Sequence, residues 1–118
     1  MIFIVDDDRE FAECTAKMVR KFCQDRVEIF GNAIEAISEI DEEVPKLIFL
    51  DILLDGPDGF TFLNELVSYT DTAKIPVVIM SSLKLSEQKL AEYGVVAVLD
   101  KAKMTPDDIR RLVKEYAN

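Results

Sequence analysis

Residues 47–59 read LIFLDILLDGPDG, and this stretch decides the fold. Its first four residues are apolar without interruption, and a carboxylate, Asp51, follows them directly. A continuous apolar run of this length is typical of a parallel β-strand covered on both faces. Gly56, Asp58 and Gly59 are predicted to serve the geometry of the turn behind it. The stretch therefore predicts a central strand that ends in a carboxylate.

Four more short apolar runs lie along the chain, at Ile2–Val5, Val27–Phe30, Val77–Met80 and Val95–Leu99. Glu28 interrupts only the second run, which indicates that this strand lies at an edge of the sheet. Segments with helical periodicity follow each of the five runs. Each segment has an expected apolar stripe. In chain order, the stripes are Phe11, Cys14, Met18 and Phe22 for the first segment; Ile34, Ile37 and Ile40 for the second; Phe60, Leu63, Leu66 and Val67 for the third; Leu85 and Leu90 for the fourth; and Ile109, Leu112, Val113 and Tyr116 for the fifth.

Strict alternation of strand and helix, repeated five times, predicts an α/β fold. Such a chain forms a five-stranded parallel sheet with right-handed crossovers and helices on both faces. The last helix is expected to have Thr105 as its N-cap, with Pro106 in its first turn. A length of 118 residues suits one compact core, so we expect a single domain, residues 1–118.

The composition excludes several classes of function. The chain has 14 Lys and Arg against 23 Asp and Glu, and no His, which gives a net charge of −9. This acid excess argues against binding to nucleic acid or to an anionic membrane surface, because phosphates attract clustered Lys and Arg. Without His, the chain cannot build a His-based triad, a His metal site or a phosphohistidine.

The location and the redox state follow from simple patterns. No apolar run approaches the ~20 residues that a membrane span needs, and the N-terminus has no signal-peptide pattern, so a cytoplasmic protein is expected. Cys14 and Cys23 would lie about 13 Å apart along one helix, too far for a disulfide. Two thiols are also too few for a structural zinc site. We expect both to be reduced and packed in the fold.

Polar residues follow four of the five predicted strands. They are Asp6, Asp7 and Asp8; Asp51; Ser81 and Ser82; and Asp100 and Lys101. The carboxyl ends of parallel strands open onto one edge of a sheet, so these side chains are expected to converge. Crowded carboxylates repel unless a cation lies among them, and Mg²⁺ suits an oxygen-only site of this kind. Lys101 and Ser81 add donors for a phosphoryl group, which predicts a metal-assisted phosphate site.

Four segments in this order make the sequence similar to a known family. They are IFIVDDD (2–8), LIFLDILLDGPDG (47–59), IPVVIMSS (75–82) and VVAVLDK (95–101). The sequence resembles, over essentially its whole length, the receiver domain of two-component response regulators. The resemblance implies a flavodoxin-like (βα)5 fold with strand order 2-1-3-4-5.

The resemblance also implies the roles of individual residues. Asp51 matches the phosphoaccepting aspartate, and Asp6 and Asp7 match the acidic pair that holds Mg²⁺ together with it. The backbone carbonyl of Leu53 matches a further metal ligand. The remaining matches are Ser81, at the position of the switch Ser or Thr, and Lys101, at that of the lysine that contacts the phosphoryl group.

The function implied is a phosphoacceptor signalling switch rather than an enzyme, because such a domain assists only its own phosphorylation and dephosphorylation. The donor must be external, since this chain has no His. A sensor histidine kinase or a histidine phosphotransfer protein is the expected donor. The output is expected to be a change in partner binding, to an unidentified protein or to a second copy in a homodimer.

The sequence departs from the family pattern at several positions. Asp55 and Ala102 each stand where the family usually has Pro, so the turn after Lys101 and the isomer of the 101–102 peptide stay open. Val98 occupies the position of the usual switch Tyr or Phe. The segment between Ser81 and Gly94 is about two residues shorter than is common, which predicts a short or displaced fourth helix.

Two other functions remain as alternatives. Asp55, Val98 and Ala102 suggest a receiver-like binding module whose output does not depend on phosphorylation. A phosphatase of the haloacid-dehalogenase kind is disfavoured, because Leu53 stands where that class needs a second Asp. A calcium loop is excluded because Leu53 and Phe62 occupy ligand positions. Asp8 is expected only to cap the first helix.

The resemblance has one further implication, for the lifetime of an aspartyl phosphate. In receivers, the attacking water passes the side chains two positions after the phosphoacceptor and two after the switch hydroxyl. These are Leu53 and Leu83, and neither side chain can orient a water by hydrogen bonding. We therefore expect a long-lived phosphorylated form, unless both side chains point away from the site.

Overall fold

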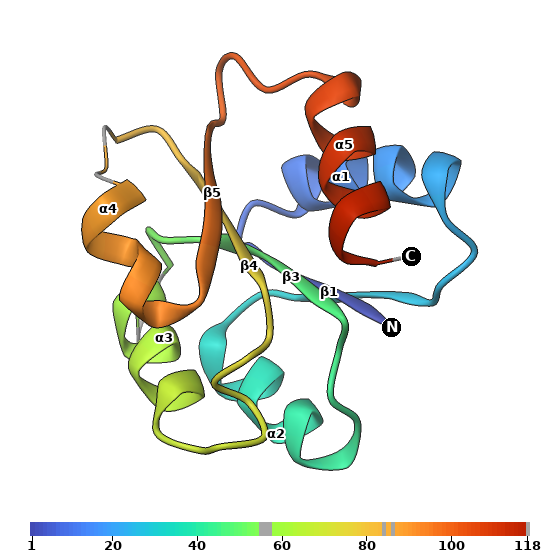
Figure 1. Cartoon of the computed structure of the whole chain (residues 1–118). Coiled ribbons are helices and arrows are strands. Elements are labelled where there is room, and N and C mark those ends of the chain that lie inside the picture. The colour runs from blue at the N-terminus through green and yellow to red at the C-terminus, as the bar shows by residue number, and fades with distance from the viewer. Residues whose placement is uncertain (55–57, 84, 86, 118) are drawn as a thin grey trace.

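The computed structural model describes residues 1–54, 58–83, 85 and 87–117. The predictions for Asp55 and Gly56 lie outside this part of the chain. Figure 1 shows strands alternating with helices along the whole chain. The elements are β1 (Ile2–Val5), α1 (Arg9–Phe22), β2 (Val27–Phe30), α2 (Ala33–Glu42), β3 (Leu47–Asp51), α3 (Gly59–Val67), β4 (Val77–Ser81), α4 (Glu87–Leu90), the 3₁₀ helix η1 (Ala91–Tyr93), β5 (Val95–Asp100) and α5 (Pro106–Tyr116).

The sheet is five-stranded with the order β2-β1-β3-β4-β5, and all neighbouring strands are parallel. This confirms the flavodoxin-like α/β fold. It also confirms the edge position predicted from Glu28, since β2 is an outer strand. β3, β4 and β5 each run one residue past the apolar run, because the ladder continues into Asp51, Ser81 and Asp100.

Two apolar layers cover the two faces of the sheet. Side chains alternate along β1, so that Ile2 and Ile4 pack with α1 and α5 while Phe3 and Val5 pack with α2 and α3. Figure 1 shows α1 and α5 together on one side of the sheet, with α2, α3 and α4 on the other. The strands thus read as continuous apolar runs because both faces are buried.

Two helices, α1 and α2, face the sheet with smaller residues than their predicted apolar stripes contain. The buried residues of α1 include Ala12, Thr15, Ala16 and Val19, while Cys14 is exposed. The expected packing of Cys14 is therefore wrong, although both cysteines are free as predicted. Ile34 and Phe60, also expected in the stripes, are exposed. In α1 and α2, alanines let the helix backbone lie close to the sheet, which displaces larger side chains such as Ile34 to the flanks.

The helix starts follow the predicted capping chemistry. The Asp8 side chain accepts a hydrogen bond from the Phe11 amide, and Thr105 forms a capping box with Asp108. Asp58 caps α3 by the same means. Gly59 was predicted to serve a turn, but it is the first residue of α3. Glycine is needed there because a Cβ atom would lie 2.6 Å from the Cα atom of Ile52.

The fourth helix is short, as the sequence predicts. α4 has four residues and continues into the 3₁₀ helix η1. Gly94 ends this segment with a φ of 79°, a left-handed conformation that glycine adopts without strain. None of the helices in the described residues is long and apolar enough to cross a membrane.

Candidate functional site

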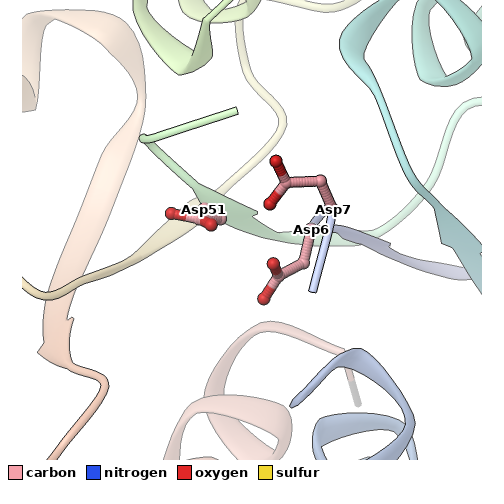
Figure 2. Close-up of side chains that lie close together, drawn as sticks. All are labelled: Asp6, Asp7 and Asp51. Carbon is pink, nitrogen blue, oxygen red and sulfur yellow. The ribbon is translucent and has the colours of Figure 1, made fainter. Parts of the chain in front are cut away.

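The carboxyl edge of the sheet brings three predicted carboxylates together. Asp6 and Asp7 follow β1 and Asp51 ends β3, the neighbouring strand, so the two strand ends lie side by side. Ligand oxygens of the three residues lie within 4.8 Å of one another (Figure 2). Asp6 and Asp51 are buried, with exposed fractions of 1% and 5%, whereas Asp7 is exposed. The predicted convergence of these side chains is confirmed.

Lys101 lies between two of these carboxylates. Its Nζ atom is 2.9 Å from Asp6 Oδ2 and 3.1 Å from Asp51 Oδ2. Burial alone lowers the pKa of the Lys101 ammonium, but its contacts with Asp6 and Asp51 outweigh burial and raise this pKa above the ordinary value. Lys101 therefore stays positively charged and neutralises part of the buried negative charge.

One carboxylate oxygen of Asp6, Oδ2, has only the Lys101 ammonium as a partner among the described residues. Burial raises the pKa of Asp6, and the hydrogen bond from the Asp8 amide and the contacts with Lys101 only partly offset that effect. Oδ1 accepts the Asp8 amide at 2.9 Å, while the buried Oδ2 has its ion pair but no hydrogen bond among the described residues. A buried carboxylate oxygen with an unused lone pair suits a hard cation.

The ends of β3 and β4 are built alike. Asp51 Oδ1 accepts a hydrogen bond from the Leu53 amide at 3.0 Å, and Ser81 Oγ accepts one from the Leu83 amide at 2.9 Å. Ser81 is fully buried, and its side chain is bonded to this amide rather than to the carboxylates or to Lys101. Its backbone carbonyl accepts the Lys101 amide at 3.0 Å, so Ser81 and Lys101 are joined through the backbone.

The turn after Lys101 forms without a proline. The Lys101–Ala102 peptide is trans. Asp100 shapes the turn, because its side chain accepts the Ala102 amide at 2.8 Å and its carbonyl accepts the amides of Lys103 and Met104. An aspartate that bonds an amide two residues on is a common turn signal, and this role of Asp100 could have been predicted from it.

Phe11 is a site residue that the sequence analysis missed. Lys101 Nζ lies 4.4 Å from the centroid of the Phe11 ring, a cation–π contact. The sequence assigned Phe11 only to the apolar stripe of α1. Its position in the first turn of the helix that follows Asp6 and Asp7 places it beside the site. Val98, at the position of the usual aromatic, is half-buried against the core cluster of α2 and α3.

Comparison with known proteins decides the family. Residues 2–114 match the family model of the response regulator receiver domain. The chain belongs to this family. It is thus a receiver domain of two-component signalling, and an acidic cluster such as Asp6, Asp7 and Asp51 is typical of the Mg²⁺ site of receivers. Receivers are typically signalling modules without an enzymatic activity on other substrates, and the family implies a cognate histidine kinase.

Several curated relatives contain a similar receiver. Response regulator Rre1 from Synechocystis is 25% identical over 115 residues, which cover 96% of this chain and 49% of that protein. A protein-glutamate methylesterase/protein-glutamine glutaminase from Geobacter metallireducens is 31% identical over 110 residues, covering 87% of this chain and 30% of that protein. The chain therefore spans half or less of these two relatives.

Solved structures share the fold. A CheY-like receiver domain protein from Methanospirillum hungatei has a TM-score of 0.81 at 25% identity, covering 97% of this chain and 90% of the other. The receiver domain of NtrX from Brucella abortus has a TM-score of 0.83 at 22% identity, covering 98% and 96%. The second likeness supports the fold alone.

Proposed function

We propose that residues 1–118 form one receiver domain that accepts a phosphoryl group on Asp51. The donor is the phosphohistidine of a sensor histidine kinase or a histidine phosphotransfer protein. In this step an Asp51 carboxylate oxygen bonds to phosphorus while the bond from phosphorus to the donor imidazole breaks. The imidazole keeps the electron pair of that bond and takes up a proton. The observation that carries the proposal is Asp51 itself, a buried carboxylate that shares Lys101 with Asp6.

The same cluster is proposed to hold Mg²⁺. Asp6, Asp7 and Asp51 offer the all-oxygen ligand set that this ion prefers, with the Leu53 carbonyl as a fourth protein ligand. The buried Asp6 Oδ2, whose one partner among the described residues is the Lys101 ammonium, supports this assignment. When bound, the ion supplies positive charge that offsets the repulsion between Asp51 and an anionic phosphoryl donor.

Lys101 and Ser81 are proposed to complete the site. The Lys101 ammonium donates a hydrogen bond to the Asp51 carboxylate, so it is close enough to contact an oxygen of a phosphoryl group on Asp51. Ser81 ends the strand next to β3, and its hydroxyl is proposed to donate to the same group. The hydrogen bond from the Lys101 amide to the Ser81 carbonyl keeps the two residues in a fixed relation.

A second candidate function rests on Val98. This side chain is half-buried against the core cluster that includes Ile79 and Leu90, so β5 carries no aromatic ring at this position that could move with Ser81. That observation favours a receiver-like binding module whose output does not depend on phosphorylation. Such a module would keep the fold and the Mg²⁺ site.

Intact mass distinguishes the two functions. After incubation with acetyl phosphate and Mg²⁺, we expect the parent protein to gain one phosphoryl group. Asp51→Asn should lose the phosphoryl adduct while its melting curve stays cooperative. Asp71→Asn changes an exposed acid outside the proposed site and should keep the adduct. An unmodified parent protein that still binds Mg²⁺ would contradict the phosphoacceptor and favour the binding module.

A further inference from the structure

A groove lies between α2 and α3, away from the Asp51 site. Each helix begins near the carboxyl end of one strand and runs back, so the second halves of α2 and α3 lie toward the opposite edge of the sheet. Figure 1 shows α2 and α3 on the same side of the sheet. The groove has a volume of about 240 Å³, and its apolar lining comes from Ile37, Ile40, Val44 and Tyr69. Tyr69 is 57% exposed, so much of this apolar lining faces solvent.

The polar lining of the groove is acidic. Four carboxylates border it, from Asp41, Glu42, Glu65 and Asp71, and its lining contains no Lys or Arg among the described residues. The surrounding sequence has the same bias, because residues 27–73 contain eleven Asp and Glu but one Lys, a net charge of −10. The rest of the chain carries +1, so the net charge of −9 comes from residues 27–73.

Some surface acids of this chain pair with cations, and the four at the groove are among the described acids that do not. Glu13, Glu43 and Asp107 each pair with an arginine. None of the four acids at the groove forms an ion pair with any residue that the structure describes. Uncompensated like charges around an apolar hollow repel one another, and a cationic ligand would relieve that repulsion.

We propose that this groove binds a cationic amphipathic segment of a protein partner. One aliphatic or aromatic side chain of the segment enters the groove, and its Lys or Arg side chains face the four carboxylates. The volume favours a single side chain, because sites for small molecules usually measure about 300–1,000 Å³. An apolar anchor surrounded by complementary charge is a common arrangement in protein interfaces. The groove shares no residue with the proposed phosphoacceptor site, so this surface is a separate function.

A synthetic peptide tests the proposal with the whole chain. The probe is a 14-residue helical peptide of Leu and Lys at amphipathic spacing, with a twin in which Gln replaces every Lys. Titration into the isotopically labelled protein should shift backbone amide resonances in residues 33–44 and 62–73. The neutral twin should bind about tenfold more weakly, because the charge attraction is lost.

Matched variants distinguish binding at the groove from general electrostatic attraction to the acidic protein. Asp41→Asn with Glu65→Gln should weaken binding of the Lys peptide about tenfold. Glu10→Gln with Glu92→Gln removes the same charge from exposed positions elsewhere and should leave the dissociation constant within about twofold. Tyr69→Ala should weaken binding, while Tyr69→Phe should retain it, since the ring rather than the hydroxyl forms the apolar lining.

Three results would overturn the proposal. Equal loss of peptide affinity in both charge variants would mean that the Lys peptide is attracted to the acidic protein as a whole and not to the groove. No amide shift in α2 or α3 at millimolar peptide would mean that the groove does not bind such segments. If the same shifts appear without peptide as protein concentration rises, a second copy of this chain is the occupant instead.

Discussion

The two ends of the sheet hold carboxylates in opposite ways. At the carboxyl end, Asp6 and Asp51 are buried and share the Lys101 ammonium. At the other end, Asp41 and Glu65 border an apolar groove without an ion pair among the described residues. A carboxylate that leaves water needs a cation, whereas one that stays in water does not. The first end is therefore sensitive to any loss of charge balance, and the second is available to a partner.

The largest effect on stability should follow from removing the buried cation. Lys101→Met leaves two buried carboxylates without their ammonium, so it should lower the free energy of unfolding by about 3 kcal/mol in the absence of Mg²⁺. Urea denaturation at neutral pH measures this loss. Lys46→Met is the matched control, because Lys46 pairs with Asp25 at a more exposed position and should cost at most about 1 kcal/mol. Equal losses in the two variants would contradict the contrast between the two ends.

The next effect should come from Mg²⁺ itself. Binding to the native state alone stabilises a protein by about 2.7 kcal/mol when the free ion is at 100 times its Kd. We expect Mg²⁺ to raise the melting temperature, and Asp7→Ala to remove most of that rise. Asp71→Ala, an acid at the opposite end, should keep the full response. A full Mg²⁺ response in Asp7→Ala would show that the ligand assignment is wrong.

A smaller, kinetic effect should appear in the loss of the phosphoryl group. Leu53 and Leu83 are 50% and 52% exposed at the ends of β3 and β4, so they border solvent instead of packing in the core. The double variant Leu53→Asn, Leu83→Glu should lose the phosphoryl group about threefold faster, which corresponds to ~0.7 kcal/mol of barrier. Decay after removal of the phosphodonor, with Mg²⁺ held constant, measures this rate.

The control for that experiment keeps the apolar character of both positions. Leu53→Met with Leu83→Met should leave the decay rate unchanged, because methionine cannot orient a water either. Equal rates in the polar variant and the parent would mean that neither leucine lies on the path of the attacking water.

The smallest effect should come from the groove. Asp41→Asn with Glu65→Gln relieves repulsion between acids that have no ion pair among the described residues, so it should raise the free energy of unfolding by about 0.3 kcal/mol at low salt. High salt should erase the gain, because it screens exposed charges. Thermal melting at two salt concentrations measures the difference. A loss of stability in this variant would show that these acids have stabilising contacts.

The sequence could predict the carboxyl end of the sheet because that end depends on topology. Continuous apolar runs identified the strands, and parallel strands bring their carboxyl ends to one edge. The meeting of Asp6, Asp51 and Lys101 follows from those two facts alone. The same reasoning located Ser81 on the right strand, although its hydroxyl is bonded to the Leu83 amide.

Other features depend on how closely the elements approach one another, which periodicity does not measure. The stripes placed Cys14 and Ile34 inward, but α1 and α2 approach the sheet through alanines. The contact between Phe11 and Lys101 joins residues that are distant in the sequence, so no local pattern indicates it. The groove between α2 and α3 is likewise a property of the packed helices, although the acidic bias of residues 27–73 is visible in the sequence.

The position of Lys101 has a consequence for the order in which the chain can fold. Asp6 directly follows the first strand to be synthesised and Asp51 ends the third, while their ammonium arrives with the residue after β5. A nascent sheet that lacks β5 would have to bury both carboxylates without Lys101, at a cost of several kcal/mol. Partly assembled sheets are thereby disfavoured, and folding becomes more cooperative around the last strand.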